Sequence, residues 1–135
     1  ELEEIAKAQG VTLQPGDALI VNCGRESYER ELGPWGTDPQ RRPGLHASCL
    51  PFIRRADVAV LAWDMMDLMP SGYEVAPRGV HPVLYRYGVA LVDNARLDGL
   101  AAACAEEERY EFMLTLAPLI VEGGTGSPVN PIAVF

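Results

Sequence analysis

The chain has 135 residues, the size of a single domain, and its 48% apolar and 22% charged content is ordinary for a globular protein. This composition excludes collagen-like, low-complexity and wholly disordered chains. Nineteen acidic against 11 basic residues give a formal net charge of −8, which opposes non-specific binding to nucleic acid. No segment approaches the roughly 20 apolar residues that a membrane helix needs. We therefore expect neither a nucleic-acid nor a membrane partner.

The first residues and the cysteines indicate whether the chain is part of a longer product and in which redox environment it folds. It begins Glu1-Leu2-Glu3-Glu4, with no initiator Met and no signal peptide, so we interpret it as a piece of a longer product or a trimmed chain. The three cysteines are odd in number and show no C-x-x-C spacing. They predict free, buried or half-buried thiols in a reducing cytoplasm.

Three short apolar runs bounded by turn residues predict buried strands at residues 18–21, 58–63 and 89–92. Residues 1–8 have the apolar spacing of a helix, and a turn follows at 13–17. Further helices are predicted at residues 46–55, 82–87 and 97–107, and residues 27–32 form either a short helix or an irregular segment. The elements thus alternate between strand and helix.

The remaining segments are rich in Pro and Gly. Residues 33–44 read as a surface loop, and residues 65–80 as a long loop, which in compact domains is functional or disordered. A fourth strand is predicted at 110–119, with a turn at 123–131 before the apolar end of the chain. The pattern predicts an α/β or α+β domain without an internal repeat or a domain boundary.

The glycine-rich segment 123–128 (GGTGSP) superficially resembles a phosphate-binding loop. It has no Lys after the glycines, and Pro128 and Pro131 prevent a helix from following, so it fails both nucleotide-binding fingerprints. Two interpretations remain, a tight turn between two strands that needs positive φ at its glycines, and a ligand-binding loop.

The chain has two histidines, and their positions differ. His46 opens a predicted helix, as a surface or capping residue would. His81 ends the long loop, precedes a helix and lies 12 residues before Asp93, which follows a predicted strand. Asp64 follows another strand in the same way. Polar groups just beyond strand ends bind ligands in open α/β sheets, although Asp there also commonly caps the next segment.

Several motifs, in order along the whole chain, resemble the metal-dependent cyclase family of hydrolases, which includes bacterial kynurenine formamidase and isatin hydrolase. They are residues 13–19 (LQPGDAL), 43–45 (PGL), 57–61 (DVAVL) with Asp64, His81, 88–94 (GVALVDN) and 123–133 (GGTGSPVNPIA). The resemblance implies that residues 1–135 are the C-terminal portion of one domain with the family's swivelling β/β/α-type fold.

The resemblance also implies a zinc or manganese site and hydrolysis of a C–N amide bond. The family's metal motif, His-x-Gly-Thr-His-x-Asp, is not in this sequence, so the main ligands are expected upstream. In the family's kynurenine formamidases, a later His followed 12 residues on by Glu completes the metal cluster. His81 and Asp93 have this spacing, with the shorter Asp in place of Glu. In isatin-hydrolase-like members the corresponding His is an acid/base group beside one manganese ion, and the long loop favours that version.

The resemblance therefore assigns His81 as the catalytic residue and Asp93 as a metal ligand or as a neighbour that orients His81. The substrate expected is a small cyclic amide or N-formyl compound, and the protein is expected to be a homo-oligomer. The alternative is a catalytically inactive module that keeps the fold and binds a ligand or partner. The sequence indicates no substrate-binding residues.

Overall fold

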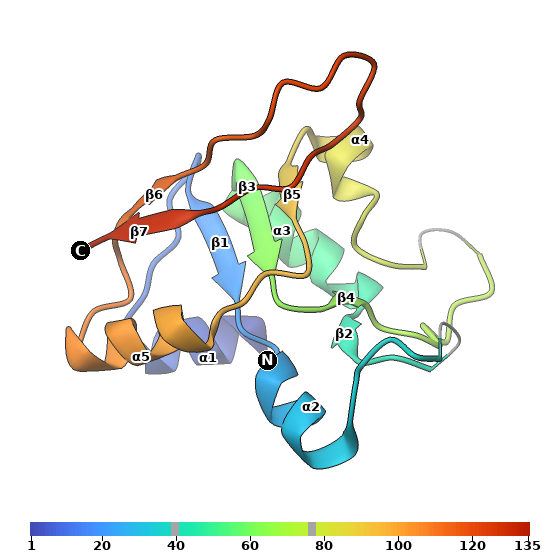
Figure 1. Cartoon of the computed structure of the whole chain (residues 1–135), viewed down its shortest axis with the longest axis horizontal. Coiled ribbons are helices and arrows are strands. Elements are labelled where there is room, and N and C mark those ends of the chain that lie inside the picture. Colours follow the sequence, from blue (N-terminus) through green and yellow to red (C-terminus); the bar gives the residue numbers. More distant parts are fainter. Residues whose placement is uncertain (39–40, 76–77) are drawn as a thin grey trace.

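The three predicted apolar runs form a parallel sheet with the strand order β1-β3-β5 in the computed structural model, which describes residues 1–38, 41–75 and 78–135. The strands are β1 (Ala18–Val21), β3 (Val60–Trp63) and β5 (Ala90–Val92). Ala18 pairs with Val60, and Val60 with Ala90, so all three strands end at the same edge (Figure 1). Because the sheet is parallel, the residues that follow each strand meet at that edge.

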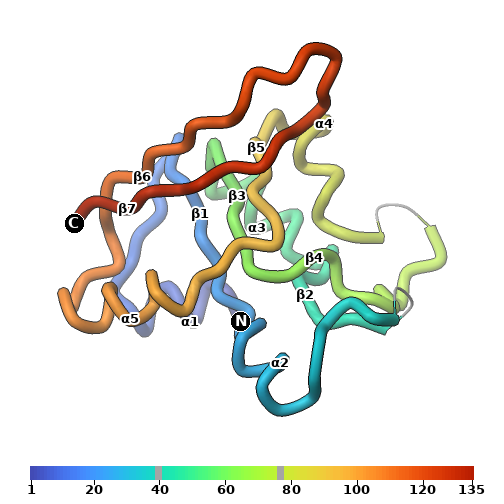
Figure 2. The backbone as a smooth tube through the Cα atoms, viewed as in Figure 1, coloured from blue at the N-terminus to red at the C-terminus, as the bar shows by residue number. Residues whose placement is uncertain are grey.

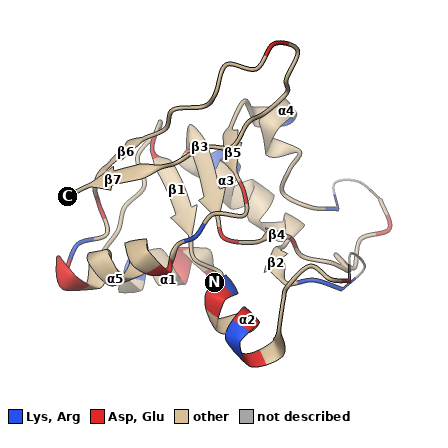
Figure 3. Ribbon diagram, viewed as in Figure 1, with Lys and Arg blue, Asp and Glu red and all other residues tan. Residues whose placement is uncertain are grey.

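Helices precede, connect and follow the strands of the sheet. They are α1 (Leu2–Ala8), α2 (Arg25–Leu32), the 3₁₀ turn η1 (Ala47–Cys49), α3 (Leu50–Ala56), α4 (Val83–Tyr87) and α5 (Asp98–Glu106). The segment at 27–32 that sequence left open is thus helical and begins two residues earlier, at Arg25. Pro51 lies in the first turn of α3, where its missing N–H costs nothing. In Figure 3 the charged residues gather on the helices and loops, while β1 and β3 are uncharged.

The core lies between the sheet and α3. Ile53 of α3, Leu61 and Trp63 of β3, and Val83 of α4 are almost completely buried in one cluster. Burying each such side chain stabilises the fold by about 1.5–3 kcal/mol. None of the residues of β1 is fully buried, so the sheet is less well covered on the β1 side.

The predicted long loop at 65–80 is in part ordered by a strand, which corrects the sequence interpretation. Within it, β4 (Met66–Asp67) pairs in parallel with β2 (Gly44–Leu45). Gly44 has φ 154° and would place a Cβ 1.7 Å from the Met66 carbonyl oxygen, so only glycine allows this close pairing. Residues 76–77 of that loop, like residues 39–40 of the predicted loop at 33–44, fall outside the described residues.

The C-terminal part forms an antiparallel pair that sequence predicted only partly. The strand predicted at 110–119 is limited to β6 (Met113–Thr115), which pairs with β7 (Ile132–Val134). In the view of Figure 2, the connection between them runs from the β6–β7 pair to a turn above α4 and returns past β5 and β3. The segment 123–128 lies between β6 and β7, as the turn interpretation expects, but of its three glycines only Gly123 has a positive φ, 71°, so the expected positive φ is wrong for Gly124 and Gly126.

No helix in the described part of the chain is both long and apolar enough to cross a membrane. Cys23, Cys49 and Cys104 are free thiols, half-buried or buried, as predicted. The cytoplasmic location stays a prediction.

Candidate functional site

His81 lies between two carboxylates at the C-terminal edge of the sheet. Its Nδ1 is 3.0 Å from Oδ2 of Asp67, and its Nε2 is 3.1 Å from Oδ2 of Asp93. The side chains of Asp67, His81 and Asp93 are 18%, 36% and 40% exposed. His81 and Asp93, which lie 12 residues apart in the sequence, are therefore in contact, and the arrangement leaves the imidazole partly open to solvent.

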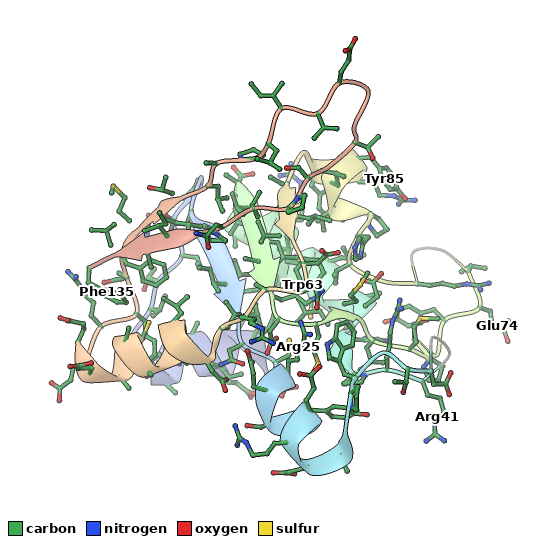
Figure 4. The ribbon with its side chains drawn as sticks, viewed as in Figure 1. Arg25, Arg41, Trp63, Glu74, Tyr85 and Phe135 are labelled. Atoms are coloured by element: carbon green, nitrogen blue, oxygen red, sulfur yellow. The ribbon has the colours of Figure 1, made fainter. Side chains whose placement is uncertain are left out.

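Local backbone structure holds each member of this cluster. Pro82 is the N-cap of α4, so His81 stands at the start of that helix, and Asp93 follows the last residue of β5. The Trp63 ring lies edge-on to the imidazole, with the ring centroids 5.5 Å apart and the planes at 76°. Trp63 is fully buried and lies in the centre of the molecule (Figure 4), so it gives the imidazole a rigid wall.

Asp67 is a member of the cluster that sequence analysis missed. It ends β4, and its Oδ1 accepts a 2.7 Å hydrogen bond from the Val80 N–H while its Oδ2 faces His81. Gly79 makes this possible, because a Cβ there would lie 2.2 Å from the Asp67 carboxyl carbon. The sequence feature that could have identified Asp67 is the presence of a carboxylate, Asp67, and a glycine, Gly79, in the predicted loop before His81.

The carboxylates change the protonation of the imidazole. The hydrogen bond to Asp67 raises the pKa of His81 against the opposing effect of burial, and Asp93 adds to the rise. Burial alone would raise the pKa of Asp67, but the bonds from His81 and from the Val80 N–H outweigh it, and the pKa of Asp67 is lowered. The cluster thus favours a positively charged imidazole beside a charged Asp67.

Asp64 has the same position relative to its strand as Asp93 but a different role. It is completely buried, and its two oxygens accept hydrogen bonds from the Cys23 N–H at 2.7 Å and the Arg25 N–H at 2.8 Å. These N–H groups lie at the start of α2, where a helix favours negative charge. Asp64 therefore anchors α2 instead of joining a ligand site.

Arg25 links the start of α2 to Asn94, the residue after Asp93. Its guanidinium group donates to the side-chain and backbone oxygens of Asn94 and pairs with Glu29 at 3.2 Å. It also lies over the Trp35 ring, 5.3 Å from the centroid. Figure 4 shows Arg25 at the upper end of α2, below Trp63. These contacts leave the Arg25 guanidinium engaged with protein groups.

His46 has the capping role that the sequence suggested as one possibility. Its Nδ1 accepts from the Ser48 N–H at the start of η1, and its Nε2 is 2.7 Å from the Ser71 carbonyl oxygen. Both nitrogens are thus occupied by structural contacts.

An apolar hollow of about 940 Å³ lies elsewhere, between α1, β1, α5 and β6. Its described lining contains no histidine, and its charged members are Asp17 and Glu111. The acid–base chemistry of the described residues is concentrated around His81 instead, so we place the candidate site there.

Comparison with solved structures agrees with the family indicated by the motifs. Over 99% of its length, the chain matches a structure described as "Crystal structure of a novel cyclase", with 31% sequence identity and a TM-score of 0.78. The chain spans 45% of the length of that protein. No family model and no curated protein matches the sequence. The predicted mixed α/β fold class is confirmed.

Proposed function

We propose that the chain belongs to the cyclase family and forms the acid–base part of a metal-dependent hydrolase that cleaves a C–N amide bond. The observation that carries the proposal is the His81 imidazole, held between Asp67 and Asp93 at the edge of the sheet where ligands bind in such folds. The similarity to a cyclase structure along almost the whole chain supports it.

The residues of this chain fit a metal ion only as part of a ligand set. Among the described residues no group of three or more His, Cys, Asp or Glu side chains is placed to hold one. Oδ2 of Asp93, 3.1 Å from Nε2 of His81, could supply one carboxylate ligand, a type that zinc and manganese both accept, and Nε2 of His81 then stays available for proton transfer. A catalytic zinc site usually has about three protein ligands, so we propose that the others lie upstream.

The mechanism uses His81 to move a proton. When bound, the metal would polarise the amide carbonyl and lower the pKa of a water molecule to about 7. His81 takes the proton of the attacking water and returns it to the leaving nitrogen. A positioned acid/base group of this kind contributes about 10² to 10⁴-fold. Because Asp67 and Asp93 raise the pKa of His81, they stabilise the imidazolium that forms when His81 takes this proton. We propose a small cyclic amide or N-formyl compound as substrate.

The test is a screen of cyclic amides and N-formyl compounds with the intact protein supplied with manganese or zinc, followed by His81→Ala. We expect kcat to fall about 10²-fold or more with the fold intact, because the His81 side chain is 36% exposed and is not a member of the buried core cluster. His46→Ala is the matched control and should leave kcat unchanged.

Near-full activity of the His81→Ala variant would refute this assignment. Absence of hydrolysis across the screen by metal-loaded, folded protein would instead support an inactive ligand- or partner-binding module.

A further inference from the structure

We propose that Asp67 is a positioning residue that keeps neutral His81 in its Nδ1–H tautomer and so presents the Nε2 lone pair on the Asp93 side. The inference deepens the proposed function, on which its catalytic consequence rests. The tautomer itself can be measured without a substrate.

The position of Asp67 is fixed independently of His81. Its backbone belongs to β4, which pairs with β2, and its carbonyl oxygen accepts from the Arg42 guanidinium at 3.1 Å. Its side chain is fixed by the Val80 N–H on Oδ1, which leaves Oδ2 directed at Nδ1 of His81. Gly79 provides the space for this side chain. The carboxylate is therefore prearranged, and the imidazole adapts to it.

A carboxylate accepts hydrogen bonds and cannot donate them, so each nitrogen of His81 must donate to satisfy its neighbour. A charged imidazole satisfies both, but a neutral one satisfies either Asp67 or Asp93. The Asp67 side chain is 18% exposed and the Asp93 side chain 40%, so water replaces a lost bond more easily at Asp93. The remaining proton therefore stays on Nδ1, and the base available for chemistry is Nε2.

His46 provides an internal reference with the opposite tautomer. Its Nδ1 accepts from the Ser48 N–H, and its Nε2 faces the Ser71 carbonyl oxygen, which can only accept. His46 must therefore carry its proton on Nε2. The two histidines of this chain are expected to give opposite patterns in the same spectrum.

The experiment is long-range ¹H–¹⁵N correlation NMR of histidine-labelled intact protein. Metal is removed by chelation so that no ion determines the tautomer, and the pH is set where both rings are neutral. The resonances of His81 and His46 are identified by their loss in His81→Gln and His46→Gln. We expect a protonated Nδ1 and an unprotonated Nε2 for His81, and the reverse for His46.

The decisive variant is Asp67→Asn. Its amide oxygen can still accept from the Val80 N–H, but its NH₂ group then faces Nδ1 of His81, which must accept. The unprotonated-type ¹⁵N resonance should move from Nε2 to Nδ1. Gly79→Ala leaves every hydrogen-bonding group in place and displaces the Asp67 carboxylate, so it should reduce the Nδ1–H population. Asp93→Asn is the control and should leave the proton on Nδ1.

The inference is overturned if wild-type His81 is Nε2–H, or if folded Asp67→Asn and Gly79→Ala variants both keep the wild-type pattern. Its failure is distinguishable from that of the proposed function. A shift of tautomer in Asp67→Asn, together with full activity of His81→Ala, would support the positioning and refute the hydrolase role. Loss of activity in His81→Ala, together with an unchanged tautomer in Asp67→Asn, would support the hydrolase role and refute the positioning.

Discussion

The replacement Asp64→Ala tests whether this buried carboxylate anchors α2. The change removes the acceptor of the Cys23 and Arg25 N–H bonds, at 2.7 and 2.8 Å. A hydrogen bond to a charged group contributes about 1.5–3 kcal/mol, so losing both should cost about 3–6 kcal/mol. That is a large part of the roughly 5–15 kcal/mol by which a domain is stable. Urea unfolding of the intact protein should show a lower midpoint at an unchanged m-value.

Asp98→Ala is the matched control for this measurement. Asp98 pairs with Arg30 at 3.9 Å on the surface, with both side chains about half or more exposed (49% and 69%). Such a pair contributes at most about 1 kcal/mol. If Asp64→Ala cost no more than Asp98→Ala, the carboxylate would not be anchoring α2, and the interpretation of Asp64 as a structural residue would be wrong.

Four further results are expected. Burial, followed by the nearby charge of Asp64, raises the pKa of Cys23 to about 12, so its thiol should resist alkylation near pH 8 in folded protein; rapid labelling there would contradict this. In metal-free protein, the stability lost in Asp67→Asn should be largest between about pH 4 and 6.5, between the unfolded-state pKa values of Asp and His. It should shrink as pH rises through the raised pKa of His81 or falls through the lowered pKa of Asp67; a penalty constant with pH would exclude the ionic contact. Gly44→Ala should lower the melting temperature markedly, because its Cβ would overlap the Met66 carbonyl, and an unchanged melt would refute the close β2–β4 pairing. Residues 1–135 alone should bind zinc or manganese weakly, and a submicromolar site in calorimetry would disprove the expectation of upstream ligands.

The sequence predicted those features that depend on local pattern. The strand at residues 18–21 was located to the residue, because an apolar run bounded by turn residues has few alternatives. The sequence left the contact between His81 and Asp93 open, because it offered only their 12-residue spacing and the position of Asp93 after a predicted strand; the structure shows the contact.

The features that were missed depend on long-range packing. A two-residue strand such as β4 has no periodicity, so the segment that contains Asp67 reads as a loop, and its place is set by β2 more than 20 residues away. Asp64 and Asp93 have the same sequence signal, and only the docking of α2 distinguishes a buried anchor from an exposed carboxylate. The strand predicted at 110–119 was too long because, in the described structure, only Met113–Thr115 pairs with another strand, and Leu119 at the predicted end is exposed in the connection.

The attachment of α2 has a consequence for how the protein tolerates change. The backbone of Arg25 is held by Asp64 after β3, and its guanidinium holds Asn94, the neighbour of Asp93 after β5. A displacement of α2 is therefore expected to move Asn94 and, with it, the carboxylate of Asp93 beside His81. Substitutions along this helix that alter its docking should change the spacing between Asp93 and His81. Substitutions in α2 are therefore expected to change the reactivity of His81 even when Asp67, His81 and Asp93 are all kept.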